Sequence, residues 1–235
     1  MLSFNLSMSH YQIVHFEQIE EHITFIRINP TDITLTLKDI FNSIADLSWI
    51  HQFDKEYLRD SFTVRAEKSI ETIKAKIVDR IDDGVTTDSG ELIVSELARR
   101  SLIDRMKYTD IPLGDLIKEK KGNNHGFDFF SENFDKRHVL FGEAKYLTNL
   151  NAYGNAFKQI VGFENEKKDI SDLRDIDGFC SEESLHNVTR GHKGFVAAFS
   201  STEMDSIELI ENFKQNPHFG TLANFKELIC IAINL

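Results

Sequence analysis

Three charged residues lie in stretches of the chain that are otherwise apolar. Asp128 lies in the run GFDFF, and Glu143 and Lys145 lie in HVLFGEAKYL, which follows after a polar turn. Side chains alternate between the two faces of a strand, so Glu143 and Lys145 must project from one face. If the two runs form an antiparallel hairpin, the Asp128 carboxylate comes close to that of Glu143. We therefore expect the three charges to converge on one site.

These residue types together favour one kind of chemistry. Two carboxylates held side by side repel each other at neutral pH unless a proton or a divalent cation lies between them. Hard oxygen ligands with room for water and phosphate suit Mg²⁺ or Mn²⁺. A lysine beside such a cation can orient or help to deprotonate an attacking water and stabilise the charge that builds on a phosphorus centre. The residues therefore predict metal-dependent hydrolysis of phosphodiester bonds.

The spacing Glu-x-Lys alone is weak support, because it occurs three times. The copies at 119–121 and 166–168 lie in polar, lysine-rich stretches that are typical of a solvated surface. Only Glu143 with Lys145 lies in an apolar run, where an unpaired charge would be unfavourable. The alternative for this pair is an edge strand on which the two side chains pair on an exposed face.

The periodicity of the chain predicts an α/β fold with a mixed sheet flanked by helices. A largely buried helix is expected over 88–106, where Asp88 and Glu91 have the spacing of a capping box. After it we expect strands over 126–130 and 138–147, a helix over 150–168, a polar acidic loop, a strand over 194–200, a helix over 206–215 and a strand over 226–235. This order of elements describes an α/β sandwich.

Residues 1–82 are predicted to form an N-terminal α+β region beside a core at 83–235. The runs YQIVHF and ITFIRI, followed by ITLTLKDIF, are rich in β-branched and aromatic residues and predict two or three strands, with Asn29-Pro30 as a turn. A helix is expected around 35–47. Isoleucines spaced at three and four residues predict an amphipathic helix over 65–81.

The composition limits the class of protein. With 41% hydrophobic and 28% charged residues, the 235-residue chain has the content of an ordinary globular protein. No apolar run approaches the roughly 20 residues of a membrane helix, and two cysteines fit a reducing compartment, so we expect a cytoplasmic protein without a membrane partner. The formal charge of -11 disfavours a simple DNA-binding module and is compatible with a nuclease that has a basic partner.

The order of the motifs resembles a known superfamily. A helix with Glu, a strand with Asp, a strand with Glu-x-Lys and a further helix make up the pattern of PD-(D/E)XK nucleases. In particular, GELIVSEL at 90–97, the following IPL, HGFD at 125–128 and GEAKYL at 142–147 resemble the nuclease subunit of the Hachiman anti-phage defence system. The resemblance covers residues 85–165.

The resemblance implies a role for each residue that matches the motifs. Asp128 and Glu143 correspond to metal ligands for Mg²⁺ or Mn²⁺, and Lys145 corresponds to the catalytic lysine. The helix carboxylate matches Glu91, which would also bind the metal. The resemblance further implies DNA as the substrate, a superfamily 2 helicase as the partner, and an N-terminal region available for partner binding.

The sequence offers two candidates for the helix carboxylate. Glu96 lies between Leu92, Ile93 and Ile103 on one apolar face of the helix, whereas Glu91 could be no more than the capping-box partner of Asp88. We favour Glu91, with Glu96 as the alternative, and both could be structural.

Weaker candidates surround this core. Lys118, Lys120 and Lys121 precede the strand that carries Asp128 and could contact DNA phosphates, although a solvated run of charges is an equal alternative. The turn RGHKG at 190–194 could also contact phosphate. Gln159 lies on the helix after Glu-x-Lys, where some members of the superfamily carry a glutamine.

Three functions are compatible with these residues. The first is a Mg²⁺-dependent DNA nuclease that acts with a helicase in anti-phage defence. The second is a catalytically idle interaction subunit of such a complex, against which the intact Asp128, Glu143 and Lys145 argue. The third is a stand-alone restriction or repair nuclease, which the net charge and the lack of a recognisable DNA-reading module disfavour.

Overall fold

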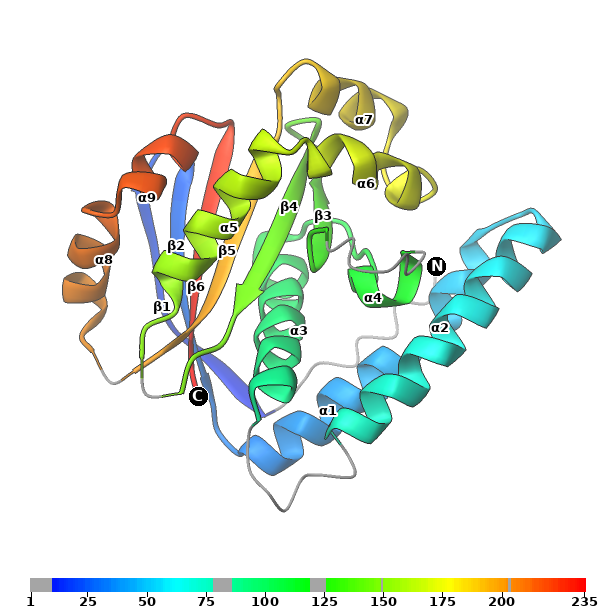
Figure 1. Ribbon diagram of the computed structural model, residues 1–235, viewed down its shortest axis with the longest axis horizontal. Helices are drawn as coiled ribbons and strands as arrows, with labels where there is room; N and C mark the ends of the chain where they lie inside the picture. The colour runs from blue at the N-terminus through cyan, green and yellow to red at the C-terminus, as the bar shows by residue number, and fades with distance from the viewer. Residues whose placement is uncertain (1–9, 78–85, 119–125, 149, 203) are drawn as a thin grey trace.

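Six strands form one mixed sheet in the order β1-β2-β6-β5-β4-β3. The computed structural model describes residues 10–77, 86–118, 126–148, 150–202 and 204–235 (Figure 1). The strands are β1 (Tyr11–Glu20), β2 (Ile23–Pro30), β3 (Phe129–Asn133), β4 (His138–Lys145), β5 (Gly194–Ser201) and β6 (Glu227–Asn234). The four central strands run parallel, and the edge strands β1 and β3 are antiparallel to their neighbours.

Helices cover both faces of this sheet. They are α1 (Ile33–Ala45), the 3₁₀ helix η1 (Ser48–Gln52), α2 (Glu56–Ile77), α3 (Thr87–Met106), α4 (Gly114–Ile117), α5 (Tyr153–Asn165), α6 (Lys168–Ile176), α7 (Glu182–Thr189), α8 (Ser206–Lys214) and α9 (Pro217–Leu222). All eight residues of β5 are buried, as expected for a parallel strand covered on both sides.

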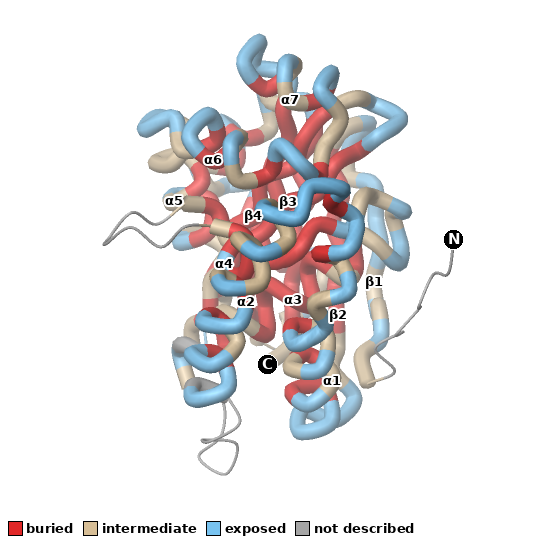
Figure 2. Tube along the Cα trace, turned by 90° about the vertical axis from the view of Figure 1, so that its right-hand side faces the viewer, coloured by how far each residue is buried: buried red, intermediate tan, exposed pale blue. Residues whose placement is uncertain are grey.

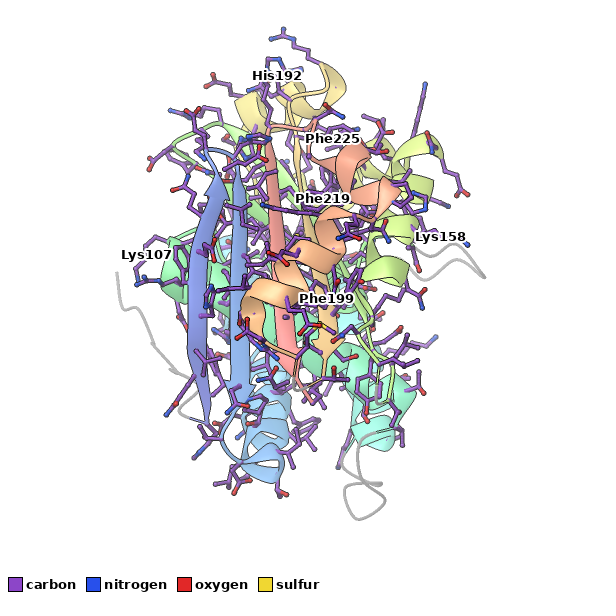
Figure 3. All side chains as sticks on the ribbon, turned by 90° about the vertical axis from the view of Figure 1, so that its left-hand side faces the viewer. Lys107, Lys158, His192, Phe199, Phe219 and Phe225 are labelled. Carbon is purple, nitrogen blue, oxygen red and sulfur yellow. The ribbon has the colours of Figure 1, made fainter. Side chains whose placement is uncertain are left out.

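A different set of helices covers each face of the sheet. α3 contacts β3 to β6, and α1 and α2 pack outside it (Figure 2). On the opposite face lies α5 with α9 and α8. There the ring of Phe157 packs against those of Phe199 and Phe219; the latter two are labelled in Figure 3. Among the described residues, no helix is long and apolar enough to cross a membrane.

Much of the predicted order is confirmed. The chain has an α/β fold with a six-stranded mixed sheet, and β3 and β4 form the expected antiparallel hairpin. The stretch ITLTLKDIF, which also fitted a strand, belongs to α1, and β2 extends through Pro30. The N-terminal strands continue the core sheet, because β2 pairs in parallel with β6. The expected boundary between residues 82 and 83 lies outside the described residues.

The acidic segment after α5 was wrongly predicted to be a loop. It forms α6 and α7, and a further short helix, α9, precedes β6. The residues that α6 buries, Asp169, Asp172 and Ile176, have a helical spacing. The prediction failed because two of the three are polar, so the segment shows no apolar periodicity. Each buried aspartate is paired with a lysine, Lys193 and Lys118 respectively.

Candidate active site

Asp128 lies where the hairpin ladder ends. Its backbone N–H donates to the carbonyl of Gly142 at 2.9 Å, directly before β3 begins at Phe129. Its side-chain Oδ2 accepts the N–H of Ala144 at 2.8 Å. β4 extends beyond its partner here, so the carboxylate replaces the missing backbone acceptor. This bond explains how a charge is accommodated in an apolar hairpin.

Glu143 and Lys145 project together from the end of β4. Lys145 Nζ donates to Glu143 Oε1 at 2.7 Å and to the Ala144 carbonyl at 3.0 Å. The register places Lys145 beside Phe199 of β5, whose ring packs against Tyr153. Both charged side chains therefore lie on the sheet face that α5 covers. The Glu143 side chain is only 1% exposed, and its Oε2 is buried without a hydrogen-bond partner among the described residues.

Glu91 reaches this pair from α3, on the other face of the sheet. Its Oε1 lies 3.4 Å from Lys145 Nζ, and its side chain is 41% exposed. The two groups meet at the end of β4, where the neighbouring Tyr146 packs on α3. A Cβ atom at Gly90 would overlap the Tyr146 ring, so glycine allows this approach. The helix start therefore depends on Gly90 to bring Glu91 near the strand.

The capping box of α3 differs from the predicted one. Thr86 is the N-cap, its side chain accepts the N–H of Ser89, and the Ser89 side chain accepts the N–H of Thr86. The predicted spacing of Asp88 and Glu91 is therefore not the capping box. Glu91 contacts Lys145 instead.

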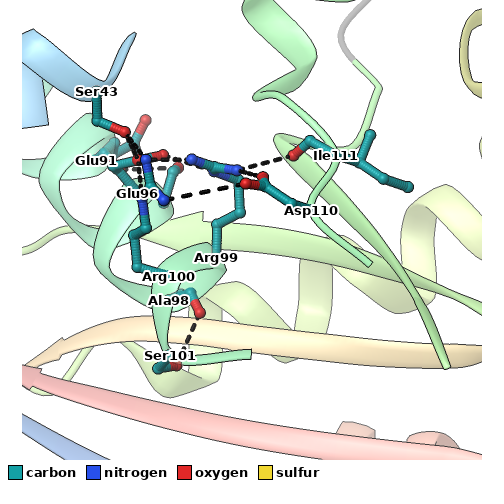
Figure 4. Close-up of polar contacts among 10 residues, drawn as sticks. Ser43, Glu91, Glu96, Ala98, Arg99, Arg100, Ser101, Asp110 and Ile111 are labelled. Atoms are coloured by element: carbon teal, nitrogen blue, oxygen red, sulfur yellow. Dashed lines mark hydrogen bonds and ion pairs between the residues drawn. The ribbon is translucent and has the colours of Figure 1, made fainter. Parts of the chain in front are cut away.

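Glu96, the alternative helix carboxylate, lies in a different environment (Figure 4). It is fully buried and accepts hydrogen bonds from Arg99 Nε at 2.7 Å, Arg100 Nε at 3.1 Å and Ser43 Oγ at 2.8 Å. Burial alone would raise the pKa of Glu96, but Arg99 and Arg100 outweigh that effect and hold it below its ordinary value. Asp110 completes the network through Arg99. Glu96 is thus a structural residue, and the carboxylate beside Lys145 is Glu91.

The electrostatics of the site favour an added positive charge. Burial raises the pKa of Asp128 to about 6, although Lys145 and the Ala144 N–H oppose the rise. Burial and the charge of Asp128 raise the pKa of Glu143 well above its ordinary value, with Lys145 acting against them. Burial would lower the pKa of Lys145, but Glu143 and Asp128 outweigh it and raise the pKa. Lys145, with a smaller effect of Lys118 on Asp128, does not neutralise this set of carboxylates, since the pKa values of Asp128 and Glu143 stay raised.

The donor atoms at the site fit a hard divalent cation. Asp128 and Glu143 supply carboxylate oxygens, and the buried, unpartnered Oε2 of Glu143 lacks the hydrogen bond that such an atom normally has. Within the described ranges, no three acidic, histidine or cysteine side chains are grouped closely enough to form a complete cation site. Glu91 is engaged with Lys145, so the half-buried Asp128 and the buried Glu143 are the candidate ligands best placed here.

The weaker candidates are placed elsewhere. Lys118 is largely buried, with its Nζ 2.8 Å from Asp172 Oδ2, so it does not present a free charge to DNA. Lys120 and Lys121 lie outside the described residues. The turn at 190–194 lies at the opposite end of β5 from the site, and Lys193 pairs with the buried Asp169. Gln159 lies half-buried on α5, the helix that covers the site's face of the sheet.

Two supporting residues had been missed in the sequence. Gly114 donates its N–H to the Asp128 carbonyl at 2.7 Å, and a Cβ there would lie 2.8 Å from the Phe127 carbonyl oxygen. Asp172 accepts the N–H of Phe127 at 3.1 Å. The helical spacing of Asp172 with Asp169 and Ile176 is the signal that could have revealed it.

Comparison of the chain with protein families, curated proteins and solved structures gives no match. A function must therefore be inferred from the residues of the site, their order along the chain and the sheet that positions them.

Proposed function

We propose that the protein is a metal-dependent DNA nuclease with a PD-(D/E)XK fold. The observation that carries the proposal is the meeting of Asp128, Glu143 and Lys145 at the end of one hairpin, with Glu143 Oε2 buried and unpartnered. A buried acid with a raised pKa beside a second acid is a frequent feature of functional sites. Glu91 on the preceding helix agrees with the order of residues in that superfamily.

Asp128 and Glu143 would hold Mg²⁺ or Mn²⁺, with water and a phosphate oxygen completing the oxygen set. Glu91 would hold Lys145 at the exposed rim of the site. A divalent cation in such a site supplies a more acidic bound water and polarises the scissile phosphate. Ala144 contributes by fixing one oxygen of Asp128 through its N–H, which leaves the other free to bind. Both carboxylates would be used in the ionised form, because a bound cation offsets the burial that raises their pKa values.

Lys145 would act as a positively charged hydrogen-bond donor. Its pKa is raised, so the ammonium stays protonated near neutral pH and does not serve as a general base. From its position beside Glu143 it can donate to the attacking water or to a phosphate oxygen, where negative charge develops. Glu91 and Glu143 hold the ammonium from two sides and so fix its direction.

The proposed substrate and partner follow from charge and from the resemblance of the motifs. The net charge of -11 does not favour unaided capture of DNA, so the proposal includes a superfamily 2 helicase as the subunit that binds it. The complex would act in anti-phage defence in the cytoplasm. The N-terminal region is the proposed contact with the partner.

Cleavage of labelled duplex and single-stranded DNA tests this proposal. The chain would be assayed with and without the co-purified helicase, in Mg²⁺ and in a chelator. We expect Mg²⁺-dependent cleavage that Glu143→Gln abolishes. Glu166→Gln is the matched control, since that residue belongs to an exposed Glu-x-Lys copy and its side chain is 65% exposed. Cleavage that persists in Glu143→Gln contradicts the assignment of the site.

A further inference from the structure

Two charged side chains hold the peptide group that precedes Asp128. Lys118, at the end of α4, donates from Nζ to the Phe127 carbonyl at 2.6 Å. Asp172, on α6, accepts the Phe127 N–H at 3.1 Å. The two side chains also pair with each other at 2.8 Å, and they are only 15% and 9% exposed. We refer to Lys118 and Asp172 as the Phe127 clamp.

The clamp fits closely around the chain. A Cβ on Gly126 would lie 2.6 Å from the Asp172 carboxylate oxygens and 2.6 Å from Lys118 Nζ, so only glycine leaves room for both groups. The Phe127 ring is packed among Phe141 and Phe195 in the core. Backbone and ring are therefore fixed together, and the next residue along the chain is Asp128.

Hydrogen bonds from three other elements converge on this short segment. The clamp brings in α4 and α6, while the Asp128 N–H donates to Gly142 of β4 and its carbonyl accepts from Gly114. Such bonds restrict where the Asp128 carboxylate can lie relative to Glu143. Metal ligands tolerate displacements of only about 0.2 Å, and losing an outer partner of a ligand typically weakens metal binding about 10- to 100-fold.

We propose that Lys118 and Asp172 are positioning residues for Asp128. By fixing where the Asp128 carboxylate lies, they set the affinity of the site for a divalent cation. This inference rests on the proposed function. It gives α6 a role in the site and assigns Lys118 to holding the peptide of Phe127, in place of the contact with DNA that its sequence context suggested.

Binding of Mn²⁺ to the full-length chain tests the inference, measured from the electron paramagnetic resonance signal of free Mn²⁺. We expect Asp172→Asn and Lys118→Met to raise the dissociation constant about 10- to 100-fold. Asp175→Asn is the matched control, because it removes the same charge from the same helix. Among the described residues, Asp175 makes no hydrogen bond to residues 126–128, and its variant should bind Mn²⁺ as the wild type does. Thermal unfolding of each variant identifies any loss of the fold.

The outcomes separate this inference from the proposed function. If the wild type binds Mn²⁺ and a folded Asp172→Asn variant binds it equally well, the positioning role is wrong and the nuclease proposal stands. If Asp175→Asn weakens binding as much as Asp172→Asn does, the effect is one of charge and the clamp is again overturned. If the wild type neither binds Mn²⁺ nor cleaves DNA, alone or with the helicase, both proposals fail.

Discussion

Lys145 Nζ lies 2.7 Å from Glu143 Oε1, while the second carboxylate oxygen of Glu143 is buried and has no hydrogen-bond partner in the part of the chain that the structure describes. One oxygen of the Glu143 carboxylate is thus paired with a lysine, and the other is a buried acceptor that lacks a donor. A structural ion pair in a protein interior normally satisfies both partners, because an unpaired buried oxygen is unfavourable. Among the described residues, Asp169 Oδ1, beside Lys193, is unpartnered in the same way, so what sets Glu143 apart is the second carboxylate, Asp128, whose charge raises the pKa of Glu143 and which the proposed cation would offset.

Lys145→Met should lower DNA cleavage about 100- to 1,000-fold, the usual effect of removing one group that stabilises charge in the transition state. Asp128 and Glu143 remain in this variant, so Mn²⁺ binding should persist. Parallel assays of cleavage and Mn²⁺ binding check the prediction. Loss of both metal binding and cleavage would contradict the assigned role of Lys145, because the lysine is proposed to donate to water or phosphate and not to bind the cation.

Glu91→Gln and Glu96→Gln should have opposite effects on stability and cleavage. Glu91 is 41% exposed and bonds Lys145, so its variant should lose activity and keep its unfolding temperature. Glu96 is buried between Arg99 and Arg100, and loss of its charge should destabilise the fold by about 3–5 kcal/mol. Thermal unfolding and cleavage assays of both variants separate the two roles. A stable, inactive Glu96→Gln variant would reverse the assignment of the helix carboxylate.

Asp128 should make the metal-free protein less stable as the pH rises. Its pKa is raised from 3.8 to about 6 in the folded state, so between these values the folded protein holds a proton that the unfolded chain has lost. The stabilisation that comes from the raised pKa of Asp128 is fully present below pH 3.8 and is lost as the pH rises to about 6. The charged groups that act on Asp128 are Lys145, Glu91, Lys118 and Glu143.

The measurement for this prediction compares the unfolding temperatures of the wild type and Asp128→Asn between pH 4 and 7. The difference between the two proteins cancels carboxyl groups that do not interact with Asp128, such as Glu227, whose pKa is lowered to about 2, and it reports Asp128 together with the coupled Glu143. The wild type should lose stability relative to the variant across this range. Mg²⁺ should reverse the loss, because it binds the ionised carboxylates. A difference that does not change with pH would contradict the raised pKa of Asp128.

Gly90→Ala should destabilise the protein by about 1–3 kcal/mol and reduce cleavage, because the new methyl group overlaps the Tyr146 ring and displaces the start of α3. A second change, Tyr146→Ala, removes the ring and should recover much of the effect on α3. Urea unfolding of the single and double variants measures the coupling. Gly162→Ala, in a helix with open space around that position, is the control and should leave cleavage unchanged.

The central part of the site was predictable from local rules. The alternation of side chains along a strand placed Glu143 and Lys145 on one face, and the hairpin brought Asp128 to the same end. The structural role of Glu96 was also signalled, since Arg99 and Arg100 follow it at the helical spacings of three and four residues. That signal was outweighed by the apolar neighbours of Glu96.

Other features depend on long-range partners that one sequence does not reveal. α6 escaped prediction because its buried face carries aspartates, whose lysine partners are far away in the chain: Lys118 for Asp172 and Lys193 for Asp169. The bond from Ala144 to the Asp128 side chain depends on β4 extending beyond β3, a detail of register.

Anomalous X-ray diffraction from crystals of the chain grown with Mn²⁺ tests the central claim most directly, since it locates the cation independently of any reaction. The proposal predicts a Mn²⁺ peak about 2.0–2.3 Å from Glu143 Oε2 and from an oxygen of Asp128. A well-occupied Mn²⁺ site elsewhere, with Glu143 and Asp128 unchanged and DNA cleavage intact, would contradict it.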